Sequence, residues 1–312
     1  MSAPCKLPAA RRSVPCAAAA VVAVLFGGGL ETARAQDACP VDLARPPAEV
    51  RIDYDPFVPA RAPDRLTFGV RNPSDQPCLV EVALMDVGRA ETANVEIAAT
   101  GLEIEFRPTS AELSRGVRPG VFRYLAPPGA SEPAFDVVVT RDAVVEAGAF
   151  PHPMTLALRP PGASGATAFA EAPVGVVLNA LPRAQLNLSG SSGAFGDGPS
   201  VSVVDFGVAE TGATRRLFIQ TRTNAPARLS FRSLNDGRLR LPTGENQEER
   251  AIGYTALLAG APLDLTRPST RDVDPPRTLA GQALELILML GDVRGAQAGA
   301  YSDELTIEIS TL

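Results

Sequence analysis

The chain has 312 residues, a net charge of −6 and 45% hydrophobic residues, which is enough to build a core. An acidic chain without a basic cluster is a poor candidate for binding nucleic acid or an anionic membrane surface. Its 27 glycines and 29 prolines exceed the usual combined share of about 12%, and helical periodicity is scarce. The composition therefore favours many short strands joined by turns.

Residues 1–35 have the three parts of a secretory signal peptide. Arg11 and Arg12 lie in a basic start, residues 16–26 form an unbroken apolar run, and residues 33–35 fit an A-x-A cleavage site. The apolar run is too short to anchor the protein in a bilayer, and no later segment approaches its length. The sequence predicts an exported chain that begins at Gln36.

Two cysteines, Cys39 and Cys78, remain after this cleavage. In an exported chain, two cysteines most simply form one disulfide. The bond would close a loop of 39 residues (39 to 78) and contribute roughly 3–4 kcal/mol through chain entropy. Two free thiols are the alternative.

Short runs of alternating apolar and polar residues predict strands along the whole chain. The first group lies at 49–54, 65–71, 78–84, 94–99, 102–106, 134–140 and 154–158. Residues 160–200 then read as linkers or long loops, with predicted strands at 174–178 and 184–188. The last group lies at 201–208, 215–222, 227–233, 284–290 and 304–310. The run 284–290 lacks alternation, so it predicts either a strand buried on both faces or a short helix. Strands this short, separated by turn residues, are typical of antiparallel sandwiches or barrels.

A repeat divides the mature chain into halves of similar size. Ala147-Gly148-Ala149-Phe150 and Ala298-Gly299-Ala300-Tyr301 lie 151 residues apart (147 to 298), and the segments starting at Arg65 and Arg216 have the same offset. Two copies of one sandwich explain this offset, and a coincidence of turn chemistry is the alternative. We therefore expect an N-terminal domain at 36–180 and a C-terminal domain at 181–312.

The residues needed for catalysis or metal binding are scarce. The chain has a single histidine, His152, between two prolines, where we expect a surface loop residue rather than a catalytic base. No cluster of histidine and cysteine suits zinc. The pairs Asp53/Asp55 and Asp272/Asp274 could bind calcium, but isolated pairs of this kind are usually solvated turns. No nucleotide-binding glycine pattern occurs. We expect neither an enzyme nor a cofactor.

Three stretches of the C-terminal half, 203–242, 252–265 and 298–310, resemble the spore coat protein U domain. This domain is the pilin module of archaic chaperone–usher pili. The matching signposts, in order, are Phe206-Gly207, Ser233 with Gly237 and Leu239, Ile252 with Tyr254, and Ala298 to Asp303.

The N-terminal half is similar to the same family at fewer positions. The matching residues are Cys39, Tyr54-Asp55-Pro56-Phe57, Cys78 and the Ala147 to Phe150 stretch. It departs from the family at Phe150-Pro151-His152, where a Tyr-x-Asp is usual. This departure suits a copy with a different role.

The resemblance implies a fold and a mechanism. The fold class is all-β, with two immunoglobulin-like antiparallel β-sandwich domains in tandem. A pilin sandwich lacks one strand and accepts the N-terminal strand of the next subunit after a periplasmic chaperone has filled the gap. We expect this donor-strand groove to be lined by Leu305, Ile307 and Ile309, with Val201 and Val203 opposite. An ordinary closed core is the alternative.

The resemblance also implies partners and a place in the fibre. The partners are a periplasmic pilus chaperone, an outer-membrane usher and an adjacent pilin subunit. The predicted mature start, 36–50, contains three prolines and would be a poor donor strand. The sequence thus predicts a tip subunit at the cell surface whose N-terminal domain binds an unknown surface or ligand. In this arrangement, residues 174–178 would close the N-terminal domain from within its own chain.

Two other functions remain open. A pilus chaperone also has two immunoglobulin-like domains, although we would expect a more basic and shorter chain. A free-standing envelope binding module with two closed sandwiches is the other alternative, although such modules usually show aromatic platforms and this chain has no Trp and four Tyr.

Overall fold

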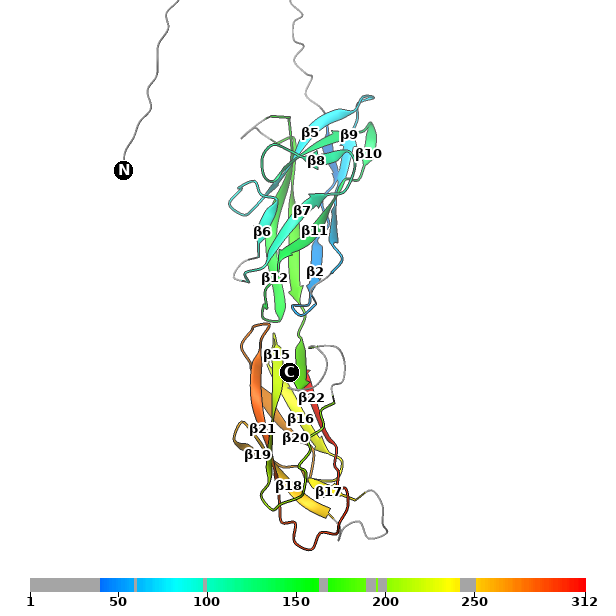
Figure 1. Cartoon of the computed structure of the whole chain (residues 1–312). Helices are drawn as coiled ribbons and strands as arrows, with labels where there is room; N and C mark the ends of the chain where they lie inside the picture. Colours follow the sequence, from blue (N-terminus) through cyan, green and yellow to red (C-terminus); the bar gives the residue numbers. More distant parts are fainter. Residues whose placement is uncertain are drawn as a thin grey trace, which may run out of the picture. The chain divides into compact units, whose positions relative to one another are not determined.

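The computed structural model describes residues 40–58, 61–97, 100–162, 168–188, 195, 201–241 and 251–312 (Figure 1). The predicted signal peptide and Cys39 lie outside this part. Residues Ala38–Leu312 form one compact unit. Within the described ranges, no helix has the length and apolar character needed to cross a membrane.

The described elements are all strands, and they form two tandem β-sandwiches. Strands β1 to β13 make the first, called here the N-sandwich, and β14 to β22 make the second, the C-sandwich. No sheet shares strands between them, and the main apolar clusters separate in the same way. The all-β tandem fold predicted from the sequence is therefore confirmed. The domain limits at 180 and 181 stay a prediction.

The N-sandwich contains three sheets. The smallest has the order β1 (Asp42–Arg45), β4 (Gly69–Asn72), β10 (Gly129–Ser131). The next has the order β3 (Asp64–Thr67), β11 (Ala134–Arg141), β7 (Glu103–Pro108), β6 (Asn94–Glu96). The largest has the order β2 (Val50–Tyr54), β13 (Ala170–Ala180), β12 (Gly148–Arg159), β5 (Cys78–Met85), β9 (Val121–Ala126), β8 (Leu113–Arg115). All pairings are antiparallel except the one between β2 and β13, which is parallel.

The C-sandwich contains two sheets. One has the order β14 (Ala184–Leu188), β15 (Thr214–Thr223), β21 (Gln282–Leu290), β18 (Ala251–Leu258), β17 (Arg238–Arg240), and β19 (Ala261–Leu263) also pairs with β18. The other has the order β20 (Ser269–Val273), β16 (Ala227–Ser233), β22 (Leu305–Thr311).

The two cores differ in how completely they are covered. Among the described residues, the main N-sandwich cluster has thirty buried apolar side chains and five partly buried ones packed against them. The C-sandwich cluster has thirteen of each kind. Because burial of apolar area is the main stabilising contribution, the described core of the C-sandwich is the less fully buried of the two.

Four sequence-based predictions need correction. Residues 201–208 form no strand, and His152 lies on strand β12 rather than in a loop. The run 284–290 belongs to β21, a strand with only one face buried. The segment after residue 160 was predicted to be a linker, but strand β13 begins within it, at Ala170.

Candidate functional site

The last strand of the C-sandwich, β22, has a free edge. It pairs antiparallel with β16, where Ile307 lies opposite Phe231 and Ile309 opposite Leu229. No strand of the described chain forms a hydrogen-bonded ladder with its other edge, although β14 of the facing sheet lies close to β22. An edge without a ladder partner presents backbone N–H and C=O groups to an extended segment that approaches it.

The N-sandwich shows what covers the equivalent edge. Strand β12 pairs with β5 as β22 pairs with β16, with Leu156 opposite Leu84, and Leu156 lies 151 residues before Ile307. On its other edge, β12 pairs along most of its length with β13. Leu156 is fully buried, whereas Ile307 is only partly buried. The greater burial of Leu156 compared with Ile307 follows from the presence of β13 beside β12.

The predicted groove residues therefore fall into two groups. Leu305, Ile307 and Ile309 are partly buried against the C-sandwich core, along the free edge of β22. Val201 and Val203 are 82% and 89% exposed, and the structure does not bring them to that core. Whether the first three line a donor-strand groove stays a prediction.

Two neighbours of Val201 and Val203 do reach the core. Val204 and Phe206 pack against it, so the segment alternates between inward and outward side chains although it forms no strand. Arg215 holds one end of the segment, because its Nε donates to the carbonyl of Asp205 and its Nη2 to that of Phe206, both at 2.7 Å. Residues 202–206 thus have the alternation of a strand but pair with no strand in the described part of the chain.

A polar cluster around Asp303 fixes the chain just before β22. The carboxylate accepts hydrogen bonds from Ser233 Oγ at 2.6 Å, from Tyr254 Oη at 2.7 Å and from the backbone N of Asn235 at 2.9 Å. The backbone N of Gly237 donates to Ser233 Oγ. Burial, together with the hydrogen bond to Asp303 and its charge, raises the pKa of Tyr254. Several signposts of the resemblance thus meet at one point.

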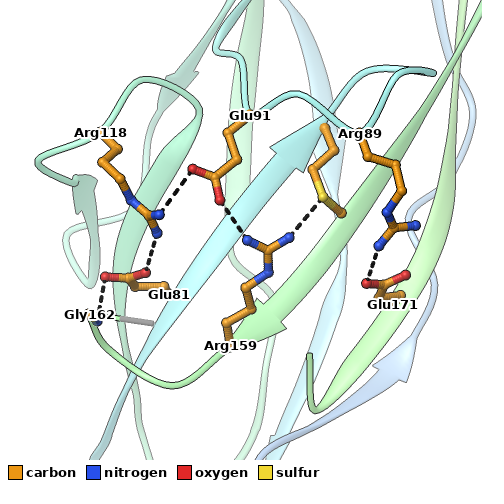
Figure 2. Close-up of polar contacts among 8 residues, drawn as sticks. Glu81, Arg89, Glu91, Arg118, Arg159, Gly162 and Glu171 are labelled. Atoms are coloured by element: carbon orange, nitrogen blue, oxygen red, sulfur yellow. Dashed lines mark hydrogen bonds and ion pairs between the residues drawn. The ribbon is translucent and has the colours of Figure 1, made fainter. Parts of the chain in front are cut away.

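The N-sandwich has a second feature of interest, a chain of alternating charges (Figure 2). Arg118 contacts Glu81 at 3.2 Å and Glu91 at 3.5 Å, and Glu91 also contacts Arg159 at 2.6 Å. Glu81 in turn accepts a hydrogen bond from the backbone N of Gly162. The Arg159 side chain is only 8% exposed, and its Nε has no hydrogen-bond partner among the described residues. Burying the charge of an arginine lowers the stability of the fold unless a carboxylate is paired with it. The ion pair with Glu91 therefore stabilises the N-sandwich around Arg159.

Two loops attached to this charge chain carry exposed apolar side chains. Val87 follows β5 and is 72% exposed, and Val117 lies between β8 and β9 and is 88% exposed. Gly120, in the same loop as Val117, has φ of 75°, and a Cβ there would lie 2.1 Å from the backbone N of Thr92, which lies in the same connection as Val87. The loops are therefore fixed in place while their valines face outward.

The other residues raised by the sequence have ordinary partners. Asp53 accepts a hydrogen bond from Asn179, and Asp55, Asp272 and Asp274 form ion pairs with arginines. No group of three or more metal-ligating side chains occurs in the described ranges. Cys78 is buried at the start of β5, and its pairing with Cys39 stays a prediction, since Cys39 lies outside those ranges.

Sequence reasoning missed the charge chain. Glu81, Glu91, Arg118 and Arg159 are separated by tens of residues or by a loop, and they meet only through the sheet order β12-β5-β9. No local motif signals such a contact. The only available hint was a charged residue, Glu81, inside the apolar run of β5.

No protein-family profile matches this chain, and no curated protein sequence matches it. Solved structures of β-sandwich proteins do. A chain of the CsuC–CsuE chaperone–tip subunit pre-assembly complex from the archaic Csu pili of Acinetobacter baumannii is 11% identical with a TM-score of 0.44, over 86% of this chain and 99% of that chain. CfaE, the adhesive subunit of CFA/I fimbria of enterotoxigenic Escherichia coli, is 13% identical with a TM-score of 0.35, over 83% and 76%. The CupB6 tip adhesin from Pseudomonas aeruginosa is 12% identical with a TM-score of 0.32, over 86% and 94%. Because all three TM-scores lie below 0.5, these likenesses do not decide what this chain does.

Proposed function

We propose that this chain is a structural and adhesive subunit of a chaperone–usher pilus, specifically its tip subunit. The C-sandwich is a spore coat protein U-like pilin domain that accepts a donor strand from the next subunit. The N-sandwich binds a surface or ligand. The chain passes through the periplasm with a pilus chaperone and an outer-membrane usher as partners, and it ends at the cell surface.

The observation that carries this proposal is the free edge of β22. Leu305, Ile307 and Ile309 are left partly exposed along an edge without a strand partner in the described chain. Adding a strand there would supply backbone hydrogen bonds and cover these side chains, as in other cases of β-augmentation. A free-standing module of two closed sandwiches would not be expected to leave such an edge uncovered, because exposed edges promote aggregation.

The N-sandwich, in contrast, needs no outside strand. Strand β13 lies between β12 and β2, and its alternate side chains are buried: Ala172, Val174, Val176, Leu178 and Ala180. Because the N-sandwich does not depend on an added strand, its loops are available to bind a surface or ligand. The outward Val87 and Val117, on loops fixed by the charge chain, are the contact residues that we propose.

The position at the tip has separate support. β1 and β2, the strands nearest the predicted mature start, both pair inside the N-sandwich, β1 with β4 and β2 with β13. These strands are used within their own chain, so they are not free to complete another subunit. A subunit that accepts a strand and gives none ends a fibre.

Co-expression tests the proposal directly. The chain is exported to a bacterial periplasm with and without a pilus chaperone, and yield, oligomeric state and thermal unfolding are recorded. We expect a soluble one-to-one complex with the chaperone and poor recovery without it. A stable monomer that forms no chaperone complex, with unfolding unaffected by donor-strand peptides, would overturn the proposal.

A further inference from the structure

We propose that Asn224 fixes the two sandwiches to each other, so that they move as one body. The contacts that do so are called here the joint. They are made by Asn224, by the connecting segment 181–183, and by two parts of the N-sandwich, residues 54–57 and Ala147. The inference goes beyond the proposed function, because it holds whatever the N-sandwich binds.

Each of the four hydrogen-bonding groups of Asn224 has a partner outside the C-sandwich. Asn224 follows β15 and is fully buried. Its Oδ1 accepts from the backbone N of Arg183 at 2.7 Å, and its Nδ2 donates to the carbonyl of Leu181 at 2.9 Å. Its backbone N donates to the carbonyl of Arg183 at 3.1 Å, and its carbonyl accepts from the backbone N of Ala147 at 2.9 Å. All four bonds therefore lead to the connecting segment or to the N-sandwich.

The equivalent asparagine of the N-sandwich makes different contacts. Asn72, 152 residues earlier (72 to 224), ends β4 and is also fully buried. Its Oδ1 accepts from the backbone N of Ser74, and its Nδ2 donates to the carbonyls of Gln76 and Ala126. These partners all belong to the N-sandwich, and an asparagine that binds the backbone two residues on is an ordinary turn residue. The C-sandwich therefore uses the matching residue to hold its neighbour instead of its own turn.

The backbone of the connecting segment is fully bonded. Leu181 N donates to the carbonyl of Tyr54 at 2.9 Å, Arg183 N donates to Asn224, and Pro182 has no N–H. The Pro182 carbonyl accepts from Nη1 of Arg183 at 3.3 Å. These three residues are all that separates β13 from β14. A rotation of one sandwich against the other would have to break these bonds, and each buried group that lost its partner would lower the stability of the chain.

Two side-chain contacts strengthen the joint at residues 54–57. Arg183 forms an ion pair with Asp55. The Cζ of Arg222, on β15, lies 4.7 Å from the centroid of the buried Phe57 ring. A guanidinium over an aromatic face is attracted by the electrons of the ring. The stretch 54–57, which the sequence analysis singled out, thus supplies the N-sandwich side of the joint.

The joint gives β12 a mechanical role. This strand starts at Gly148, directly after Ala147, and ends at Arg159 of the charge chain. A pull on the two loops attached to the charge chain would therefore pass along β12 to Asn224 and into the C-sandwich. Tandem domains without such contacts are expected to move relative to each other, and the pull would then reorient the N-sandwich first.

Residual dipolar couplings of backbone N–H groups test whether the sandwiches keep one orientation. The isotope-labelled exported chain is weakly aligned, and the couplings of each sandwich are fitted to an alignment tensor. We expect one tensor for both sandwiches in the unchanged chain and two different tensors in Asn224→Ala. Amide exchange at Leu181 and Arg183 should rise at least about tenfold in this variant, because it loses both side-chain bonds of Asn224.

Two kinds of control separate the joint from a general loss of stability. Asn72→Ala removes a buried asparagine at the matching turn and should leave a single tensor. Asp55→Asn weakens the ion pair with Arg183 and should raise exchange at Arg183 and separate the two tensors in part. Asp272→Asn breaks an exposed ion pair inside the C-sandwich and should change neither quantity. Exchange in β12 and β21 reports whether each variant keeps its fold.

Two tensors in Asn224→Ala, with one in the unchanged chain and in the controls, support the joint. Two tensors in the unchanged chain would mean that the sandwiches reorient independently, which overturns the inference. A single tensor that survives both Asn224→Ala and Asp55→Asn also overturns it, as does an equal effect of Asp55→Asn and Asp272→Asn. If an asparagine variant fails to fold, the comparison of the two aspartate variants decides. None of these outcomes bears on strand acceptance at β22.

Discussion

Leu156→Ala and Ile307→Ala each remove three carbon atoms, at positions of the two sandwiches that lie 151 residues apart. Leu156 is fully buried on β12, with Ala172 of β13 paired beside it, so its truncation leaves a sealed cavity and should cost about 3–5 kcal/mol of unfolding free energy. Ile307 is only partly buried along a free edge. Water can fill the space left there, so the cavity contribution falls away and the cost should be about 1–2 kcal/mol.

Hydrogen exchange can measure the two costs separately, since β12 and β22 give different peptic fragments of one chain. We expect the opening free energy to fall two to three times more in β12 for Leu156→Ala than in β22 for Ile307→Ala. Under the proposed function, Ile307→Ala should also weaken the binding of a peptide with the sequence of β13, residues 170–180, about tenfold, which corresponds to about 1.4 kcal/mol. Equal costs in the peptide-free chain would mean that Ile307 is already sealed, and the reasoning from the open edge would be refuted.

Three further changes test other features of the chain. Glu91→Gln leaves the buried Arg159 without its carboxylate partner and should destabilise the N-sandwich by about 2–4 kcal/mol, measured by denaturant unfolding. Asp303→Asn removes a charge that raises the pKa of Tyr254, so ultraviolet titration should show this pKa falling and the C-sandwich should melt earlier. His152 is the only histidine, and burial lowers its pKa, so the unfolded chain takes up a proton more readily as pH falls below about 6.5. Stability should therefore decline with falling pH in that range, and His152→Asn should remove this slope, as followed by thermal unfolding between pH 5 and 7.5.

Each of these changes has a control or a contradicting outcome. Glu171→Gln breaks an ion pair with Arg89 in which both side chains reach solvent, with 37% and 60% of their surfaces exposed, and it should change stability by less than about 1 kcal/mol. If it cost as much as Glu91→Gln, burial would not be the reason for the larger effect. A Tyr254 titration unchanged by Asp303→Asn, or a pH slope that survives His152→Asn, would contradict the causes given above.

Alternation and spacing predicted most of the fold. Runs such as 49–54 and 227–233 alternate because one face of each strand packs on a core, and they correspond to strands β2 and β16. The offset of 151 residues predicted two copies of one sandwich before any contact was known. Both signals are local or depend only on counting, so they are available without the structure.

Two predictions failed because they depended on neighbours. Residues 201–208 alternate as a strand does, yet a strand also needs a partner, and the described chain provides none. The prolines around His152 predicted a loop, but that part of β12 pairs only with β13, because its pairing with β5 begins at Thr155. A proline directed at the unpaired edge removes no ladder hydrogen bond, so the strand tolerates it.

The two halves of this chain differ chiefly in whether β13 has a counterpart among the described residues. Where it is present, the core closes, β2 is ordered, and the loops near Arg118 can be fixed for contact with something else. Where it is absent, the last strand of the sandwich keeps its apolar side chains only partly buried. Under the proposed function, the stability of the C-sandwich depends on the concentration and fit of an outside segment, so completing the fold and joining a partner are the same event. Ile307→Ala should then lower the melting temperature of the filled C-sandwich while leaving the N-sandwich transition in place.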